Sequence, residues 1–205
     1  MSEKEIKILC AAIEIFSEKG FQATTTNEIA KKANVAEGTI FRYYKTKKDL
    51  LLAIPACLAY TTLPQNLLQA MTSVIDQRQE TLEEFLRALI ENRRNFAIEN
   101  IAILKVLVHE IPFHPELRET IIKTILSPIL GRLMIVIDSF KERGQIINMP
   151  TEQIIRLLFS TVFGYFFSKY IVMLDLHLDN ANEVEELIQF IMNGIATKEK
   201  PLNNL

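Results

Sequence analysis

The stretch from Gly20 to Leu52 restricts what this chain can fold into more than any other part of it. It reads GFQATTTNEIAKKANVAEGTIFRYYKTKKDLLL. Thr25 is followed three residues later by Glu28, which is the spacing of a capping box: the hydroxyl accepts a backbone N–H, and the carboxylate returns to the capping residue. Apolar residues at helical spacing follow, so we expect a helix of about two turns.

Two further helix starts follow within the same stretch. Asn34 tolerates the left-handed conformation in which many helices end. A second helix is expected from about Glu37 to Tyr44, with Ile40 on its inner side, and Thr46 opens a third helix with another capped start. Two short helices across a tight turn form a helix-turn-helix, whose second helix enters the major groove of DNA.

Individual positions make this motif more specific. They are Gly20, Phe21, Ala23, Thr24, Thr25, Glu28, Ile29, Ala30, Val35, Gly38, Thr39, Ile40, Phe41, Tyr43, Tyr44, Lys47 and Leu50. With this spacing, residues 5–52 resemble the DNA-binding domain of TetR-family transcriptional regulators. The resemblance implies an all-α molecule with an N-terminal three-helix helix-turn-helix domain, residues 1–47. A C-terminal helical ligand-binding and dimerisation domain, residues 48–205, would follow.

The resemblance also assigns DNA contacts to individual residues. They are Thr25, Thr26, Gly38, Thr39, Arg42, Tyr43 and Lys47. Thr25, Thr26 and Lys47 are implied to hold phosphates, which suits helix N-termini because these attract anions. Arg42 is the candidate base contact, since its fork fits guanine O6 and N7. Gly38 is expected to allow close approach of the backbone; the alternative is that glycine is needed there only for space.

Three residues depart from the family pattern. Phe41 replaces a common tyrosine and so lacks a phenolic phosphate contact. Ala36 stands where a capping serine or threonine is usual, which forfeits about 1 kcal/mol. Glu37 would repel phosphate or accept a hydrogen bond from cytosine N4. These departures bear on the strength and sequence preference of DNA binding rather than on its mode.

The distribution of charge agrees with a phosphate-binding face. The chain has a formal net charge of −2, but residues 31–48 hold six Lys and Arg against Glu37 alone. Taken by itself, such a cluster is typical of a solvated helix face. Its coincidence with the helix-turn-helix favours contact with nucleic acid instead.

The rest of the chain is predicted to be helical. We expect a first helix over 3–19, ended by Gly20, and later helices near 81–97, 101–111, 115–143, 151–174 and 182–195. Pro55 is expected to kink or break the helix that begins at Lys47, near Ala53–Ile54, because proline removes a backbone hydrogen bond. This irregular connection either relays a signal between the two halves or merely bends around the core.

Composition bounds the class of protein. Of 205 residues, 49% are hydrophobic, which suits one or two domains. Cys10 and Cys57 indicate no disulfide framework, and Cys10 is expected to be a buried residue of the first helix rather than a redox sensor. No secretory start is present, and the longest uncharged stretch, Leu50–Ile75, is interrupted by prolines and amides. A cytoplasmic location without membrane contact is therefore expected.

The C-terminal half carries the predicted dimer and effector residues. The predicted dimer interface comprises Phe159, Phe163, Phe166, Tyr170, Leu187, Ile188 and Ile191. Two helices from each subunit would form a four-helix bundle, as the resemblance implies; the alternative is an intramolecular core. The resemblance also implies a small effector, which the apolar helices favour as mostly apolar. The candidate effector residues are Asn92, Glu110, Thr161 and Tyr165, each of which is alternatively solvated or satisfied in the core.

Catalysis and metal binding are disfavoured by what the sequence lacks. It has no phosphate-binding loop, nucleophile elbow or Cys/His cluster at ligand spacing. His109, Glu110 and His114 do not share one helix face, so no metal or cofactor is expected. We expect a homodimeric repressor on a near-palindromic operator in double-stranded DNA, released by its effector. An architectural or activating DNA binder without an effector is the alternative, and a helical enzyme is a remote one.

Overall fold

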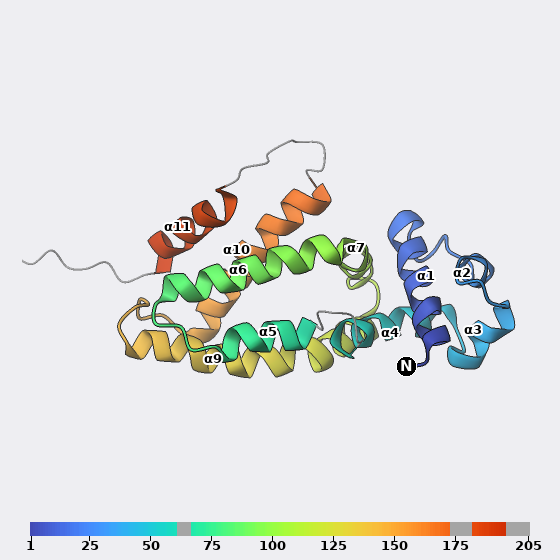
Figure 1. Ribbon diagram of the computed structural model, residues 1–205, viewed down its shortest axis with the longest axis horizontal. Helices are drawn as coiled ribbons and strands as arrows, with labels where there is room; N and C mark the ends of the chain where they lie inside the picture. Colours follow the sequence, from blue (N-terminus) through green and yellow to red (C-terminus); the bar gives the residue numbers. More distant parts are fainter. Residues whose placement is uncertain (61–66, 173–181, 196–205) are drawn as a thin grey trace, which may run out of the picture. The chain divides into compact units, whose positions relative to one another are not determined.

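The computed structural model describes residues 1–60, 67–172 and 182–195, and these ranges contain helices and no β-strand. Figure 1 shows their arrangement along the chain. The helices are α1 (Glu3–Lys19), α2 (Thr26–Lys32), α3 (Glu37–Tyr43), α4 (Lys47–Tyr60), α5 (Leu67–Asp76), α6 (Leu82–Glu99), α7 (Ile101–Glu110), α8 (Pro115–Ile121), α9 (Ser127–Glu142), α10 (Thr151–Phe167) and α11 (Glu183–Ile195). Two π-helical turns, Ile122–Leu126 and Ser168–Val172, follow α8 and α10. The predicted all-α class is confirmed.

Contacts between residues group the chain into two compact units. The first comprises residues 1–70 and 97–129, and the second comprises residues 71–96 and 130–205. The first unit therefore contains α7 and α8 as well as the four N-terminal helices. This division differs from the predicted boundary at residues 47 and 48.

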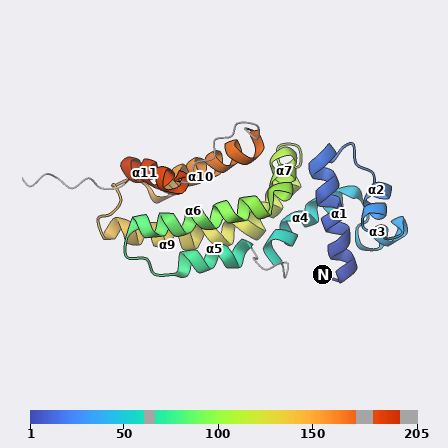
Figure 2. The same cartoon turned by 45° about the horizontal axis from the view of Figure 1, so that its top comes forward.

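Helix α1 is the centre of the first unit. Its apolar residues recur every three or four positions, so one broad face is buried. That face packs against α2, α4 and α7, and Figures 1 and 2 both show α1 beside α2. Fully buried side chains from four helices meet in this core, namely Ile8, Leu9, Ile29, Ile40, Leu50 and Ile54.

The ends of the short helices follow the rules of local chemistry. The capping box predicted at Thr25 and Glu28 is present. Asn34 has a φ of 53°, which confirms the left-handed residue expected after α2. Ala36 gives α3 no side-chain cap, as predicted. These features are readable from sequence because each depends on residues within one turn.

Two predictions about the N-terminal helices are wrong. Cys10 is exposed rather than buried, because it lies beside Leu9 on α1 but faces outward with Lys7 and Glu14. A kink or a break was predicted near Pro55; the break is absent, since α4 continues from Lys47 to Tyr60. The side chains of Leu50, Leu51 and Ile54 are fully buried, and this packing holds the helix despite one missing backbone hydrogen bond.

The second unit joins α6 and α9 through an aromatic pair and an arginine. The rings of Phe85 and Phe140 lie 5.6 Å apart. Arg143 covers the Phe140 ring at 4.2 Å and donates to the carbonyls of Gln79 (3.2 Å) and Glu80 (2.9 Å). The segment before α6 is therefore fixed to the end of α9.

A π-helical turn interrupts the long helix predicted over 115–143. Ser127 donates its N–H to the carbonyl of Ile122, five residues earlier. The next residue, Pro128, has no N–H to offer the carbonyl four residues before it, and its ring crowds that carbonyl. The wider π-turn lies where an α-helical turn would meet this conflict. Pro128 was the sequence signal for this irregularity, and our prediction of one uninterrupted helix overlooked it.

Two continuous helical runs, 115–142 and 151–172, are long and apolar enough to cross a membrane by length and composition. Neither coincides with the uncharged stretch Leu50–Ile75 considered above. Core helices of water-soluble proteins meet the same criterion, so two such runs are weak grounds for a membrane protein.

Gly20, which ends α1, offers a direct test of the backbone geometry. Its φ of 84° and ψ of 158° lie in a region essentially restricted to glycine, and open space surrounds the position of a Cβ. Gly20→Ala should therefore lower the free energy of unfolding by about 1–3 kcal/mol through strain alone. Chemical denaturation followed by circular dichroism measures this change.

Gly131→Ala is the matched control. Gly131 lies within α9 with equally open space around it, so alanine should leave stability unchanged or raise it by up to about 1 kcal/mol. Equal stability of the Gly20→Ala variant and the parent would contradict the assigned geometry.

Candidate nucleic-acid interface

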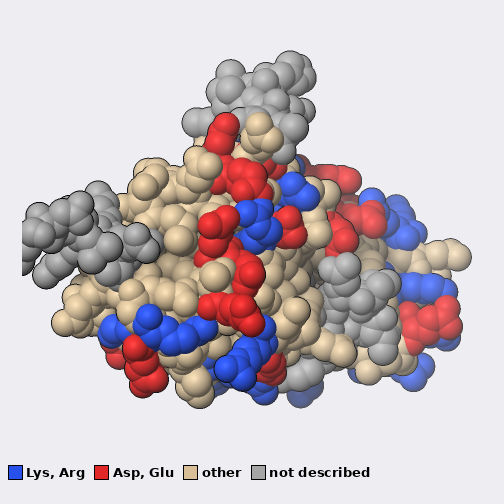
Figure 3. Space-filling model, turned by 60° about the vertical axis from the view of Figure 1, so that its left-hand side comes forward, with Lys and Arg blue, Asp and Glu red and all other residues tan. Residues whose placement is uncertain are grey.

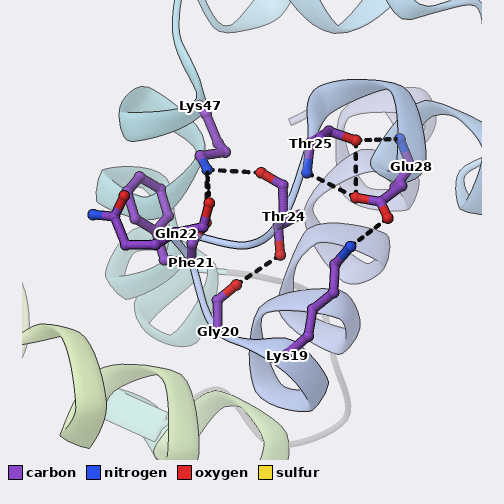
Figure 4. Close-up of polar contacts among 8 residues, drawn as sticks. All are labelled: Lys19, Gly20, Phe21, Gln22, Thr24, Thr25, Glu28 and Lys47. Atoms are coloured by element: carbon purple, nitrogen blue, oxygen red, sulfur yellow. Dashed lines mark hydrogen bonds and ion pairs between the residues drawn. The ribbon is translucent and has the colours of Figure 1, made fainter.

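The loop from Gly20 to Thr25 sets the position at which α2 begins. Phe21 is buried, and its ring meets the Phe16 ring edge-on with centroids 5.3 Å apart. Thr24 is also buried and donates its hydroxyl to the carbonyl of Gly20 at 2.8 Å. Figure 4 shows the hydrogen bond between Thr24 and Gly20 that closes this loop.

Lys47 holds this loop from the first residue of α4. Its ammonium donates to the carbonyls of Phe21 and Thr24, both at 2.7 Å, and of Gln22 at 3.2 Å. It also lies 4.5 Å from the centre of the Phe21 ring. An ammonium has three N–H donors, and all three are used within the chain. We call this set of contacts the lysine–loop contact.

The lysine–loop contact gives Lys47 a role other than the predicted phosphate contact. Burial lowers the pKa of the ammonium from its usual value, while the nearby Glu110 opposes that shift. A phosphate could reach the ammonium only by displacing a loop carbonyl. Lys47 therefore positions the segment that begins α2.

Glu110 reaches the same loop from the end of α7. Its buried carboxylate accepts the N–H of Phe21 at 3.4 Å and lies 2.9 Å from His109 Nδ1 and 3.3 Å from His114 Nε2. The ring of His114 meets that of Phe21 at 5.2 Å. Glu110 therefore joins α7 and the start of α8 to the loop, and its assignment to the effector residues stays a prediction.

The start of α2 is closed by polar contacts on its exposed side. The N–H and hydroxyl of Thr25 both donate to the Glu28 carboxylate at 2.8 Å, and the Glu28 N–H returns to the hydroxyl at 3.3 Å. Lys19 of α1 also bonds this carboxylate. The hydrogen bond from Lys19 lowers the pKa of Glu28 most, and the hydrogen bonds from Thr25 lower it further, to about 2. The capping carboxylate is thus charged throughout the neutral range.

Glu37 connects the starts of α2 and α3. It accepts the Thr26 hydroxyl at 2.5 Å and the Asn27 amide at 3.5 Å. The two roles predicted for Glu37, phosphate repulsion and recognition of cytosine, did not anticipate this internal contact. The Thr26 hydroxyl, predicted to bind phosphate, is engaged by the same contact.

The outer face of α3, which we define by Gly38, Phe41 and Arg42, is exposed. Thr39 and Tyr43 are partly exposed, and the Ser2 hydroxyl donates to the Tyr43 phenol at 3.2 Å. Gly38 lies within the helix, and no atom of the described chain lies within 4 Å of the position of a Cβ. Neither the backbone angle nor crowding within the described chain therefore requires glycine at this position.

The four predicted effector residues are not brought together as one set. Thr161 and Tyr165 of α10 line a shallow hollow of about 330 Å³ with Glu183, Glu186, Leu187 and Phe190 of α11. The Tyr165 phenol donates to Glu183 at 3.2 Å. Burial raises the pKa of Tyr165, and the negative charge of Glu183 raises it further. Asn92 lies on α6, and Glu110 belongs to the first unit.

The aromatic residues of α10 form two stacks rather than one seam. Phe163 stacks on Phe159 at 5.3 Å and on Phe167 at 5.8 Å, and Phe159 is 58% exposed. Phe166 stacks on Tyr170 at 6.0 Å and is buried. A four-residue step turns about 40° around the helix and a three-residue step about 60° in the opposite direction, so the step from Phe163 to Phe166 leads from the exposed side to the core.

Several predicted interface residues are therefore buried within the single chain. They are Phe166, Leu187, Ile188 and Ile191. Phe190 of α11, which the prediction did not include, is 69% exposed. Its neighbours Gln189 and Asn193 are exposed as well, so this side of α11 faces away from the core.

Charged side chains join α6 and α11 in the second unit. Arg87 pairs with Glu83 one turn earlier at 3.1 Å and with Glu185 of α11. Figure 3 shows a face on which acidic side chains form a band with basic ones among them, next to broad uncharged areas. Cationic and anionic groups at this junction are thus largely matched.

Comparison with known proteins identifies the N-terminal module. Residues 8–54, which include the lysine–loop contact and α3, match the family described as bacterial regulatory proteins, tetR family. Residues 8–54 therefore form a helix-turn-helix module of the TetR family.

Curated relatives match the chain mainly in this TetR-family module. An uncharacterised HTH-type transcriptional regulator of Bacillus subtilis, YvkB, is 54% identical over 48 residues, which is 23% of this chain and 25% of that protein. The matches to the first curated relatives span 25–43% of their length. The nucleoid occlusion factor SlmA of Glaesserella parasuis is 24% identical over 181 residues, covering 80% of this chain and 85% of that protein.

Solved structures share the whole TetR-family fold. The regulator FadR from Bacillus subtilis, in complex with stearoyl-CoA, superimposes with a TM-score of 0.73 at 23% identity. The superposition covers 93% of this chain and 98% of FadR. At this identity, the likeness establishes the fold.

The lysine–loop contact predicts a loss of stability when the ammonium is removed. Lys47→Met should lower the free energy of unfolding by about 1–3 kcal/mol, because loop carbonyls lose a charged partner. The matched control is Lys45→Met, since Lys45 is exposed just before α4, and this variant should unfold like the parent. If the two variants were equally stable, the loop would not depend on Lys47.

The cap of α2 predicts a pH-dependent contribution from Glu28. Because its pKa is lowered to about 2, the carboxylate stabilises the folded state above its ordinary pKa of about 4.3. That contribution is lost as pH falls through about 2. Glu28→Gln should therefore unfold at a lower temperature than the parent at pH 7, and the two should converge between about pH 4 and 2. A difference that stays constant over this range would contradict the cap.

Proposed function

We propose that this chain is a cytoplasmic, homodimeric, DNA-binding transcriptional regulator, and specifically a repressor that a small, mostly apolar effector releases from its operator. The observation that carries the proposal is the outer face of α3. It presents an exposed arginine and an exposed glycine within a module that matches the TetR family over residues 8–54. In a helix-turn-helix this face is the one that enters the major groove.

The surroundings of Gly38 support contact with something outside the chain. Glycine in a helix is less stable than alanine by about 1 kcal/mol, yet neither its conformation nor its neighbours within the described chain require it. Close approach of a DNA backbone to α3 would explain why Gly38 has no side chain. Arg42 lies one turn further along, where its guanidinium can reach a base edge.

Exposed apolar residues support association of two copies. Leu157, Phe159 and Phe163 on α10 and Phe190 on α11 are each at least 40% exposed. Large aromatic side chains are usually buried in folded proteins, and a second copy of the same helices would cover them as a four-helix bundle. Two recognition helices would then read half-sites about 34–36 Å apart on a near-palindromic operator.

A mostly apolar effector is supported by the fold and by one of its relatives. The FadR structure that shares this fold contains stearoyl-CoA. The fatty acid metabolism regulator protein of Bacillus subtilis is 41% identical to this chain over 51 residues. The apolar stripes of α6, α9 and α10 provide surfaces that such a ligand could occupy.

A DNA binder without an effector is the second candidate. The alignment with SlmA, which is named a nucleoid occlusion factor, extends over 80% of this chain. The two candidates differ in their response to ligands. An effector raises the melting temperature and weakens operator binding together, whereas a DNA binder without one shows neither change across a panel of apolar compounds.

Substitutions on the outer face of α3 test the DNA-binding proposal. A duplex recovered by selection from a random pool serves as the operator, and affinity is measured by fluorescence anisotropy. Gly38→Ala should retain or increase thermal stability but weaken binding at least tenfold, because its methyl group meets the DNA. Arg42→Ala should reduce the preference for the selected duplex over a scrambled one, by about 1–3 kcal/mol.

Leu130→Ala is a control outside the N-terminal module. It removes an exposed side chain from α9 and should leave DNA affinity unchanged. If Gly38→Ala and Arg42→Ala bound every duplex like the parent, α3 would not be the recognition helix.

A further inference from the structure

Arg93 occupies a position of α6 that faces the interior of the protein. The buried side of this helix contains Leu82, Phe85, Leu86, Leu89, Ile90, Phe96 and Ala97. Arg93 lies four residues after Leu89, three before Phe96 and four before Ala97, so it falls on the same stripe. A positive charge is thus placed where the helix otherwise buries apolar groups.

The contacts of Arg93 leave its charge without a counterion. Its Nε donates to the side-chain oxygen of Asn92 at 3.2 Å, and a second N–H bonds the same oxygen. The guanidinium lies 5.1 Å from the centre of the Phe96 ring. Both partners are neutral, and no ion pair joins Arg93 to a carboxylate of the described residues.

Two other arginines of the second unit are paired with acids. Arg87 has Glu83 and Glu185, and Arg132 has Asp76. Arg93 is also the more deeply desolvated group, since burial lowers its pKa to about 10. It remains a cation at neutral pH, and its side chain is partly accessible, so N–H donors beyond those bonded to Asn92 can meet a ligand.

A buried cation without a partner is unfavourable, and an anion relieves that cost. Removing a charge from water is tolerated when an opposite charge and further hydrogen bonds replace the solvent. The guanidinium fork matches a carboxylate or a phosphate, each of which accepts two parallel hydrogen bonds. The apolar neighbours Leu89, Ile90 and Ala97 suit a hydrocarbon portion attached to that anion.

We propose that Arg93 binds the anionic end of the effector, a carboxylate or phosphate carried on an apolar chain. The inference rests on the proposed function, in which an effector binds the chain, and adds that this effector carries a negative charge. The anionic ligand would supply the counterion that Arg93 does not have among the described residues.

Binding of three ligands with one hydrocarbon chain tests this proposal. Hexadecanoate, hexadecyl phosphate and hexadecanol are titrated calorimetrically into the full chain below their micellar concentrations. The parent should bind at least one anion about 10- to 100-fold more tightly than the alcohol, as expected for a charged hydrogen-bonded pair. The anion that binds more tightly identifies the head group as a carboxylate or a phosphate.

Variants of α6 separate recognition of the anion from packing. Arg93→Met should reduce affinity for the anions to that of the alcohol and leave binding of the alcohol unchanged. Without ligand it should be at least as heat-stable as the parent, because a desolvated charge is replaced by an apolar group of similar size. Arg93→Lys, which keeps the charge, should retain part of the preference. Arg94→Met is the matched control, since Arg94 lies off the buried stripe, and it should bind like the parent.

Two results would overturn the proposal. One is a parent that does not prefer either anion to the alcohol, or that binds none of the three ligands. The other is an Arg93→Met variant that keeps the preference or loses affinity for the alcohol equally. DNA is absent from these titrations, so a failure to regulate DNA binding would appear only in the operator assay.

Discussion

Three backbone carbonyls of one short loop converge on the ammonium of Lys47, and the geometry of the N-terminal module depends on that arrangement. The loop bonds to Lys47 through Phe21, Gln22 and Thr24. Thr25, the next residue, caps α2. Thr26 then bonds Glu37 at the start of α3. One cation thus fixes the first helix of the helix-turn-helix, and a short series of polar contacts extends that order to the second.

The same loop is held from a second direction by a buried carboxylate. Glu110 accepts the Phe21 N–H from the end of α7, and His114 packs its ring against Phe21. The Lys47 ammonium therefore binds the carbonyl of Phe21, and the Glu110 carboxylate binds its N–H. These contacts add to the packing of α7 on α1 and of α8 on α4, so α7 and α8 belong to the same compact unit as the N-terminal helices, although the family match ends at residue 54.

The features that sequence predicted are those decided within one or two helical turns. The capping box at Thr25, the left-handed Asn34 and the uncapped start at Ala36 are of this kind. The loop residues that Lys47 and Glu110 bind lie more than 20 and more than 80 residues away, so local pattern does not specify these contacts. A general signal was nevertheless present, because both Glu110 and Arg93 are charged residues on otherwise buried helix stripes.

Proline and aromatic residues show why pattern alone misplaced other features. Pro55 lies in a helix whose packing preserves its course, whereas a π-turn precedes Pro128. The aromatic residues of α10 were assigned to one face, but their alternating steps divide them between the core and the exterior. In each case the outcome depends on what the neighbouring helices cover.

The salt dependence of DNA affinity in the Lys47→Met variant tests the central claim most directly. The slope of log affinity against log salt counts the phosphates that the protein neutralises. If Lys47 acts by holding the loop, the variant should bind DNA more weakly with the slope of the parent. A slope shallower by about one, in a variant as stable as the parent, would show that the ammonium contacts a phosphate and would contradict the account.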